Sequence, residues 1–457
     1  MSWNDLYILD VFAIALFILS YYRKCYRRGY RIDFWHTQLF LTCVFPNMMM
    51  LPFAKSDLNV LVLGSDLSAV VATLPTVFLI TLLGYAAVWT GGMLWRLNAG
   101  LGYRQDAARL LNFLPNCSLM LMSSRRVLIF QAALCLAGQF VVLGYYFSAS
   151  GLAFDLRTFT FENPTLRPIA LAISNYSIVI ASHCLARYVD TRERILLLST
   201  LALTFGLFFF GARGNLVAIY LNVLLCYLVM LRNRVSLLRT FVLMGIALGF
   251  LFYLGSVRGG EYSVSGFFAS FVTLLFFGNN FSDLRDFAWV YSAWDHVWWG
   301  GKTYLAAITS FVPRFASHFR DTWAMGAATA STVGFDPQVH PGLRPGIFGE
   351  SYFNFGLVGV IAVGILVGGI LRYVDVDVKK ALSSEQPSMR KAFASTMLLS
   401  VAGCMAISAG FSGLYTLAGI YVFTWFCLML ERVFHPAWRP TSRPSALPSA
   451  TPTGGMQ

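Results

Sequence analysis

The sequence predicts an all-α polytopic integral membrane protein with about 11 transmembrane helices. Hydrophobic residues make up 57% of its 457 residues, whereas charged residues make up only 12%. Apolar runs of about 20 residues, the length that a helix needs to cross the hydrocarbon, recur along the chain. Basic residues gather between these runs rather than inside them. This composition leaves no room for a large soluble domain.

Each apolar run is expected to form one membrane-spanning helix. The spans are expected at residues 6–22, 35–53, 67–95, 127–148, 168–186, 195–211, 215–231, 240–256, 347–371, 392–411 and 413–430. Residues 1–256 then hold helices 1–8, and residues 347–433 hold helices 9–11. Between them, residues 257–346 form a large outer loop, in which the short apolar run 267–277 predicts an interfacial helix. Residues 434–457 are rich in Pro, Ser, Thr and Gly, which predicts a disordered tail.

The distribution of basic residues predicts the orientation of the chain. If each span crosses the membrane once, the connections between spans alternate between its two sides. Of the 34 Lys and Arg residues, 24 lie in the connections on one side. These connections are residues 23–34, 96–126, 187–194, 232–239, 372–391 and the tail after 431. Because basic loops stay in the cytoplasm, the N-terminus is expected outside and the C-terminus inside. The net charge of +13 is therefore topogenic, and no nucleic-acid partner is expected.

The middles of the spans contain almost no ionisable residue, which argues against a proton-driven transporter. Asp10 lies near the outer end of its span. Gln131 and Gln139 are neutral, and we expect them to pair across helices. The eight cysteines lie in spans or basic loops and imply no disulfide framework.

Motifs for metals or cofactors are weak. Asp375 and Asp377 form a D-x-D pair, but they stand beside Arg372 on the cytoplasmic side, so chance explains them best. No P-loop or zinc signature occurs, and no metal or cofactor is expected. Gly364 and Gly368 form a G-x-x-x-G pattern, which predicts a close helix-packing face.

Arginines occur at outer helix ends, where topology alone would not place them. Arg213 lies in a Gly-Ala-Arg-Gly turn before a helix expected to start at Asn215, and Arg258 stands beside Gly259 and Gly260. A helix N-terminus with a guanidinium beside it can bind a phosphate. The alternative is that these arginines snorkel to lipid headgroups.

The outer loop and the helix after it contain further candidates. Its indoles either anchor the loop in the headgroup zone or stack on sugar rings; they are Trp289, Trp294, Trp298 and Trp299. His340 is a candidate general base, although a lone loop histidine is often merely solvated. Glu350 and Asn354 share one helix face. Glu350 either compensates the helix dipole or faces a cavity, where it binds a sugar hydroxyl or orients an arginine.

Three segments resemble the Wzy-type O-antigen and oligosaccharide repeat-unit polymerases of bacterial inner membranes. They are residues 211–214 (GARG), 301–314 (GKTYLAAITSFVPR) and 346–359 (GIFGESYFNFGLVG). The third is the most specific, because hydropathy alone would not produce its order of polar and aromatic residues. The resemblance covers roughly residues 195 to 370.

The resemblance implies a GT-C-like glycosyltransferase in the inner membrane, with the large loop in the periplasm. It would transfer a glycan from undecaprenyl diphosphate to a lipid-linked repeat unit without a metal. Arginines would neutralise the diphosphate; the candidates are Arg213, Arg258, Arg314 and Arg344. His340 or Glu350 would be the base, and Asn354 would help to bind substrate. Implied partners are membrane lipids, a chain-length regulator and a flippase.

Rival functions remain open at this level. An O-antigen ligase would use the same donor with a lipid A core acceptor. A flippase or other transporter of lipid-linked sugars would need polar groups through the depth of the bundle. A structural membrane subunit would need neither.

Overall fold

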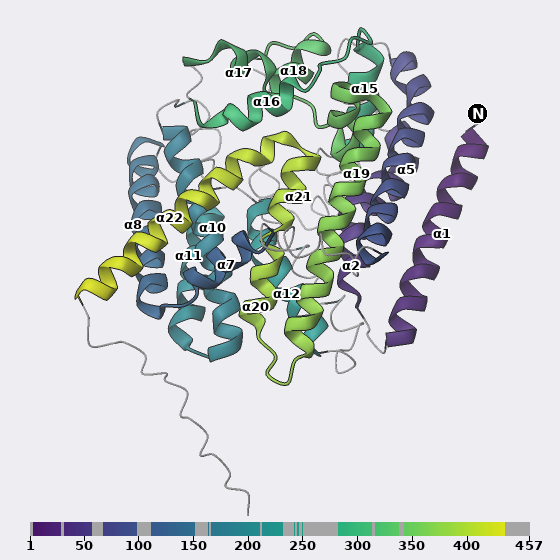
Figure 1. Ribbon diagram of the computed structural model, residues 1–457. Coiled ribbons are helices and arrows are strands. Elements are labelled where there is room, and N and C mark those ends of the chain that lie inside the picture. The colour runs from purple at the N-terminus through teal and green to yellow at the C-terminus, as the bar shows by residue number, and fades with distance from the viewer. Residues whose placement is uncertain are drawn as a thin grey trace, which may run out of the picture.

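The computed structural model describes residues 3–28, 32–56, 67–97, 111–150, 166–210, 213–231, 282–312, 316–337 and 342–434, with four isolated positions between 163 and 249. Within these ranges all regular secondary structure is helical. Long helices run side by side, and short helices cover one end of the bundle (Figure 1). Predictions for residues 251–281, including the interfacial helix at 267–277, and for the tail from 435 lie outside the described residues.

The helices follow one another along the chain as follows. They are α1 (Trp3–Arg28), α2 (Phe34–Leu39), the π-helix η1 (Phe40–Met49), α3 (Leu51–Ser56), α5 (Leu67–Leu97), α7 (Phe113–Leu121), α8 (Arg125–Ser150), α10 (Leu166–Thr191), α11 (Arg194–Phe209), α12 (Arg213–Leu231), α15 (Asp283–Ala293), α16 (Lys302–Ile308), η5 (Thr309–Phe311), α17 (His318–Trp323), α18 (Met325–Thr332), α19 (Gly346–Ser383), α20 (Met389–Thr396), α21 (Leu399–Ala406), η7 (Ser408–Gly410) and α22 (Phe411–Phe434).

Six described helices are long and apolar enough to cross a membrane, namely α1, α5, α8, α10, α19 and α22. The chain is thus a helical membrane protein. The helix α11 and the described part of α12 are apolar but shorter. Two predicted spans are interrupted: residues 35–53 form α2, η1 and α3, and residues 392–411 form α20, α21 and η7. Pro46 lies inside η1, and a proline removes a backbone donor, which favours such irregularity.

The α5 and α19 helices form the closest helix pair. A Cβ at Gly368 would lie 2.0 Å from the backbone oxygen of Val88, and one at Gly364 would lie 2.7 Å from Ala87 Cβ. On α5, a Cβ at Gly91 would lie 2.1 Å from the oxygen of Ile365. The predicted G-x-x-x-G packing face is confirmed, and glycines on both helices let the backbones touch.

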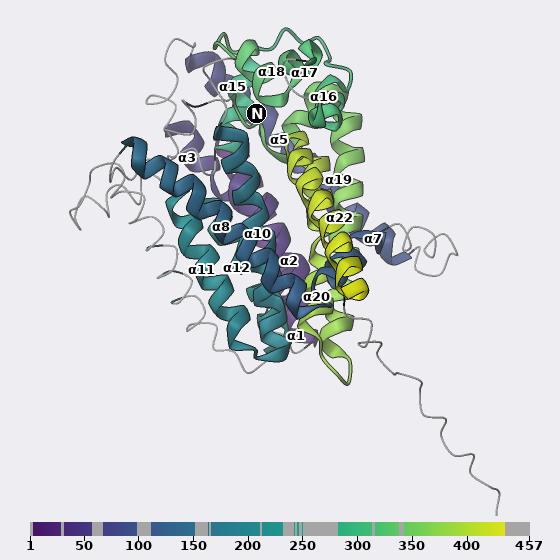
Figure 2. The same cartoon turned by 90° about the vertical axis from the view of Figure 1, so that its left-hand side faces the viewer.

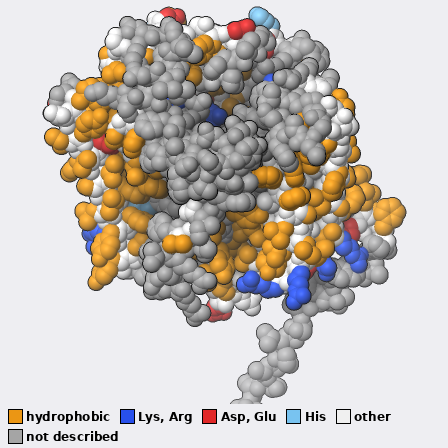
Figure 3. Space-filling view, turned by 180° about the vertical axis from the view of Figure 1, so that it is seen from behind, with side chains coloured by type: hydrophobic (Ala, Val, Ile, Leu, Met, Phe, Trp, Pro, Cys, Tyr) orange, Lys and Arg blue, Asp and Glu red, His pale blue; other side chains and the backbone are white. Residues whose placement is uncertain are grey.

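Connections that were expected on one side of the membrane meet at one end of the bundle. The contacts join Asp190 to Met389 and Arg390, Glu193 to Arg125, Asn112 to Tyr373, and Asp33 to Lys379. We call this the basic end, because Lys and Arg side chains gather there below an apolar band (Figure 3). The other end, where α15, α16, α17 and α18 lie, is the cap end (Figure 2).

Polar side chains inside the bundle pair with neutral partners. Gln131 Nε2 donates to Thr424 Oγ1 over 2.9 Å, and Gln139 Nε2 donates to Ser177 Oγ over 2.9 Å. The expected pairing of these glutamines across helices is therefore confirmed. Such bonds fix helix contacts where no water is present.

Candidate functional site

The site begins where α19 bends at the cap end. Gly356 has φ 63° and ψ −153° inside this helix, a combination open almost only to glycine. The bend frees backbone carbonyls of the preceding turn. The oxygens of Phe353 and Asn354 instead accept hydrogen bonds from the N–H groups of Trp299 and Gly300. The bend thus joins α19 to the segment that leads into α16.

Glu350 lies in the first turns of α19 and is fully buried. Its Oε1 accepts a hydrogen bond of 2.6 Å from Thr303 Oγ1 of α16. Its Oε2 accepts one of 2.7 Å from the backbone N–H of Ser408 in η7. The carboxyl group therefore ties three elements that are distant in sequence, and both oxygens bond to neutral donors.

Asn354 completes this cluster one turn further along α19. Its Nδ2 donates to Thr303 Oγ1 and to the backbone oxygen of Glu350, each over 2.8 Å. Its buried Oδ1 accepts no hydrogen bond from the described residues. The buried Ser408 Oγ likewise has no hydrogen-bond partner among the described residues. We refer to Thr303, Glu350, Asn354 and Ser408 as the Glu350 cluster.

Two of the segments that carry the resemblance, residues 301–314 and 346–359, meet in this cluster. Besides the hydrogen bonds of Thr303, the ring of Tyr304 stacks on that of Phe355 with centroids 6.0 Å apart. Sequence patterns had paired Glu350 with Asn354. Thr303 and Ser408 were missed, because residues 47 and 58 positions away leave no local signal.

Arg344 lies just before α19, and its side chain is exposed. Its backbone N–H donates to Asp286 Oδ2 over 3.2 Å, and the same oxygen accepts from Ser282 Oγ. Asp286 also pairs with Arg285 at 3.3 Å. The carboxylate of Asp286 thus fixes the approach to α19, while the guanidinium of Arg344 points outward.

Asp283 of α15 stands beside this group. Burial raises the pKa of Asp283 to about 7, with Asp286 adding to the rise and Arg344 opposing it. The folded protein therefore binds a proton between about pH 4 and pH 7 that the unfolded chain releases. Stability is lost as pH rises through this window.

We expect Asp283→Asn to flatten this part of the stability curve, measured as melting temperature from pH 4 to pH 8. Unchanged pH dependence in the variant would contradict the assignment.

Three of the four candidate indoles are buried within the protein, namely Trp289, Trp294 and Trp299. Neither a headgroup anchor nor a sugar-stacking platform fits these three. Trp298 is half exposed and lies against the bend, 3.1 Å from a Cβ built at Gly356. Of the four, only Trp298 has a substantially exposed side chain.

The remaining predicted site residues cannot be placed beside the cluster. Arg258, Arg314 and His340 lie outside the described residues. Arg213 is the first residue of α12, two positions before the expected start at Asn215, and its side chain is not described.

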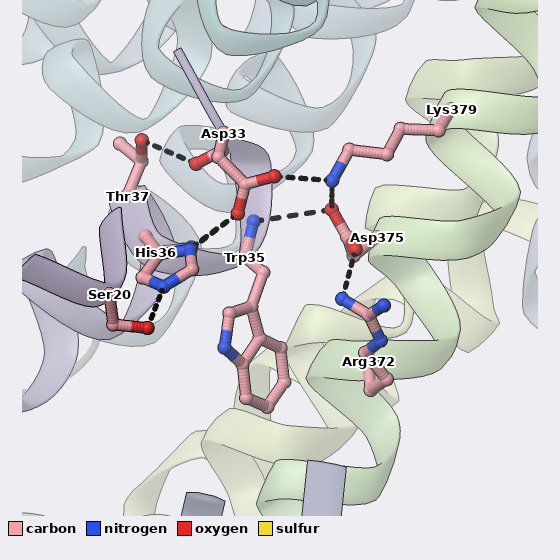
Figure 4. A network of polar contacts seen from close by, with 8 residues as sticks. All are labelled: Ser20, Asp33, Trp35, His36, Thr37, Arg372, Asp375 and Lys379. Atoms are coloured by element: carbon pink, nitrogen blue, oxygen red, sulfur yellow. Dashed lines mark hydrogen bonds and ion pairs between the residues drawn. The ribbon is translucent and has the colours of Figure 1, made fainter. Parts of the chain in front are cut away.

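A second polar centre lies at the basic end (Figure 4). Asp33 Oδ2 contacts His36 Nδ1 at 2.6 Å, and Asp33 Oδ1 contacts Lys379 Nζ at 2.6 Å. Lys379 also pairs with Asp375, whose Oδ2 accepts from Arg372 over 2.7 Å. Asp375 was attributed to a chance D-x-D pair. It instead belongs to a buried ion network that joins α19 to the start of α2.

Asp33→Asn is expected to lower the free energy of unfolding by about 3 kcal/mol at neutral pH, because a buried ion pair loses one partner. Burial alone would raise the pKa of Asp33, but His36 and Lys379 lower it overall. The contribution of Asp33 is therefore full above about pH 4 and is lost as pH falls further. Chemical denaturation from pH 3 to pH 8 checks this. The exposed Glu385→Gln is the control, and an equal effect of both variants would contradict the role of the network.

No family model, curated protein or solved structure matches this chain. Its class is therefore defined by the fold alone, as an α-helical protein with six candidate membrane-spanning helices among the described residues.

Proposed function

We propose that this protein is a polysaccharide polymerase of the bacterial inner membrane. It would transfer a glycan from undecaprenyl diphosphate to the terminal sugar of a second lipid-linked repeat unit. The observation that carries the proposal is the buried Glu350 cluster, in which two segments of the resemblance are held together at the bend of α19. Burying a carboxylate is costly unless its hydrogen bonds are made, and each oxygen of Glu350 has a donor in this cluster.

The geometry favours a positioning role for Glu350. Its side chain is 0% exposed and both oxygens already accept hydrogen bonds, so it does not face a substrate hydroxyl. We propose that it holds α16 against α19 and so shapes the cap end. Asn354 Oδ1 is buried as well, so the half-exposed Trp298 beside the bend is the described group best placed to meet a sugar.

In this proposal the cap end faces the periplasm and the basic end faces the cytoplasm. The gathering of Lys and Arg at the basic end supports that orientation. Placed arginines would stabilise the diphosphate leaving group in this proposal.

Arg213→Ala is expected to abolish chain extension while membrane abundance stays normal, because a guanidinium at the start of α12 would neutralise the diphosphate. Arg213→Lys should restore only part of the activity, since bidentate geometry is lost. The assay is the surface-glycan ladder of cells that carry each variant. A normal ladder from Arg213→Ala would remove this residue from the site.

Deleting the gene separates the two related transferases. Loss of a polymerase should leave a single capped repeat unit on the surface acceptor. Loss of a ligase should leave no repeat at all. An unchanged ladder would exclude both functions.

A further inference from the structure

We infer that the basic end holds a second ligand site, which binds a phosphate-bearing group. A cavity of about 300 Å³ opens there between α1, α2, α5 and α19. Four basic side chains line it, and none of the described residues that line it carries a carboxylate; the four are Arg23, Lys24, Arg27 and Arg372. This site is separate from the Glu350 cluster and does not depend on the proposed function.

The helix α1 presents its cations to the cavity from one face. Ser20, Arg23, Lys24 and Arg27 follow the spacing i, i+3, i+4 and i+7, which places them along one stripe. Arg23 and Arg27 are exposed, and no carboxylate among the described residues pairs with either. Topogenic charge explains basic residues at this helix end. It does not explain why they converge on a walled cavity.

The wall of the cavity that faces α1 is formed by packed aromatic rings and by Arg372, whose charge is paired with a carboxylate. Trp35 and Trp89 pack edge to face with centroids 6.4 Å apart, and both line the cavity. Arg372 is largely buried, and its charge is compensated from behind by Asp375. Lys379 is likewise compensated by Asp33. The network of Figure 4 therefore neutralises itself, and the charge of Arg23 and Arg27 is left for a ligand.

Phosphate is the anion that fits this arrangement. Two guanidinium groups one turn apart can each give paired N–H donors to phosphate oxygens. Other faces of α1 expose apolar side chains, including Ile18, Leu19 and Tyr22. A lipid headgroup is therefore one source of such a phosphate. The shared chemistry is a phosphate, and its source is either an anionic lipid or a soluble phosphate compound.

Native mass spectrometry of the purified full chain tests the site. The chain is titrated with phosphatidylglycerol, with phosphatidylcholine, and with inorganic pyrophosphate. We expect one phosphatidylglycerol to be retained in preference to phosphatidylcholine. The double variant Arg23→Gln with Arg27→Gln should weaken this binding roughly tenfold, which is about 1.4 kcal/mol.

A charge-matched control separates a site from diffuse surface charge. Arg126→Gln with Arg432→Gln removes the same charge from exposed positions at the basic end that do not line the cavity. It should leave binding unchanged. Arg23→Lys with Arg27→Lys keeps the charge and should give an intermediate affinity. If the Gln pair does not fold, the wild-type lipid preference and the Lys pair decide the question.

The outcomes distinguish the sources. Pyrophosphate binding that is lost in the Gln pair, without preference for phosphatidylglycerol, would assign the site to a soluble phosphate compound. Absence of any anion preference, or equal weakening by the Gln pair and the control pair, would overturn the inference. Chain extension is not a readout, so failure here leaves the polymerase proposal untouched.

Discussion

Gly368→Ala is expected to lower the free energy of unfolding by about 3 kcal/mol, at the upper end of what overpacking costs. The added methyl group would lie 2.0 Å from the backbone oxygen of Val88. The backbones are close at other points of the same interface as well, because a Cβ at Gly91 would lie 2.1 Å from Ile365 O and one at Gly364 would lie 2.8 Å from Gly84 O. The whole α5–α19 contact would have to open. Thermal unfolding of the purified protein in detergent measures the effect.

Gly419→Ala is the matched control for this substitution. Gly419 lies inside α22, and a Cβ there meets nothing within 4 Å. Alanine loses less backbone freedom than glycine on folding, so this variant should be stabilised by about 0.5–1 kcal/mol. A melting temperature for Gly368→Ala at or above that of Gly419→Ala would show that the close contact is not present.

Glu350→Ala is expected to disrupt the cap end and abolish chain extension. It leaves the Thr303 hydroxyl and the Ser408 N–H buried without their acceptor, and each such group costs about 1–3 kcal/mol. Thr303→Val keeps the shape and the bond between Ser408 and Glu350, but it removes the bond to Glu350 and the bond from Asn354. It should be destabilised by less. Denaturant unfolding of the two variants gives the ranking, and an undisturbed Glu350→Ala protein would contradict the cluster.

Glu350→Gln separates positioning from proton transfer. The amide keeps one acceptor and the side-chain volume, so a positioning residue should retain activity within about tenfold. A general base contributes about 10²–10⁴-fold, and its loss should remove activity while the protein stays folded. The glycan ladder and the melting temperature of the same variant decide between these roles.

Much of the fold follows from local sequence patterns. Hydropathy predicts the long helices, and the small residues at 364 and 368 predict a close packing face on α19. Only the structure shows that α5 is the helix that packs there. Alternation of the connections predicts which loops share an end, as the contact of Asp190 with Arg390 illustrates. These features depend on composition and spacing within a few turns, which is why the sequence alone reveals them.

Other features depend on contacts between distant segments. Glu350 meets Thr303 and Ser408 only because the helices are packed as they are. The same holds for Asp33, which meets Lys379 and through it is linked to Asp375. Burial of Trp294 likewise reflects neighbours such as Phe353 rather than its own segment. Hydropathy also fails at residues 35–53, where an apolar run with Pro46 forms a broken helix. The sequence therefore indicates Glu350 and Asn354 as a pair, whereas their distant partners and the ion network at the basic end could be found only from the structure.

Reconstitution tests the central claim most directly. The purified chain in proteoliposomes would be given an undecaprenyl-diphosphate-linked oligosaccharide, and the products separated by size. The polymerase proposal predicts a ladder of lipid-linked multiples without added metal, with extension lost in the Arg213→Ala variant. Intact starting material after incubation with well-folded protein, or glycan moved across the bilayer without a new glycosidic bond, would contradict it.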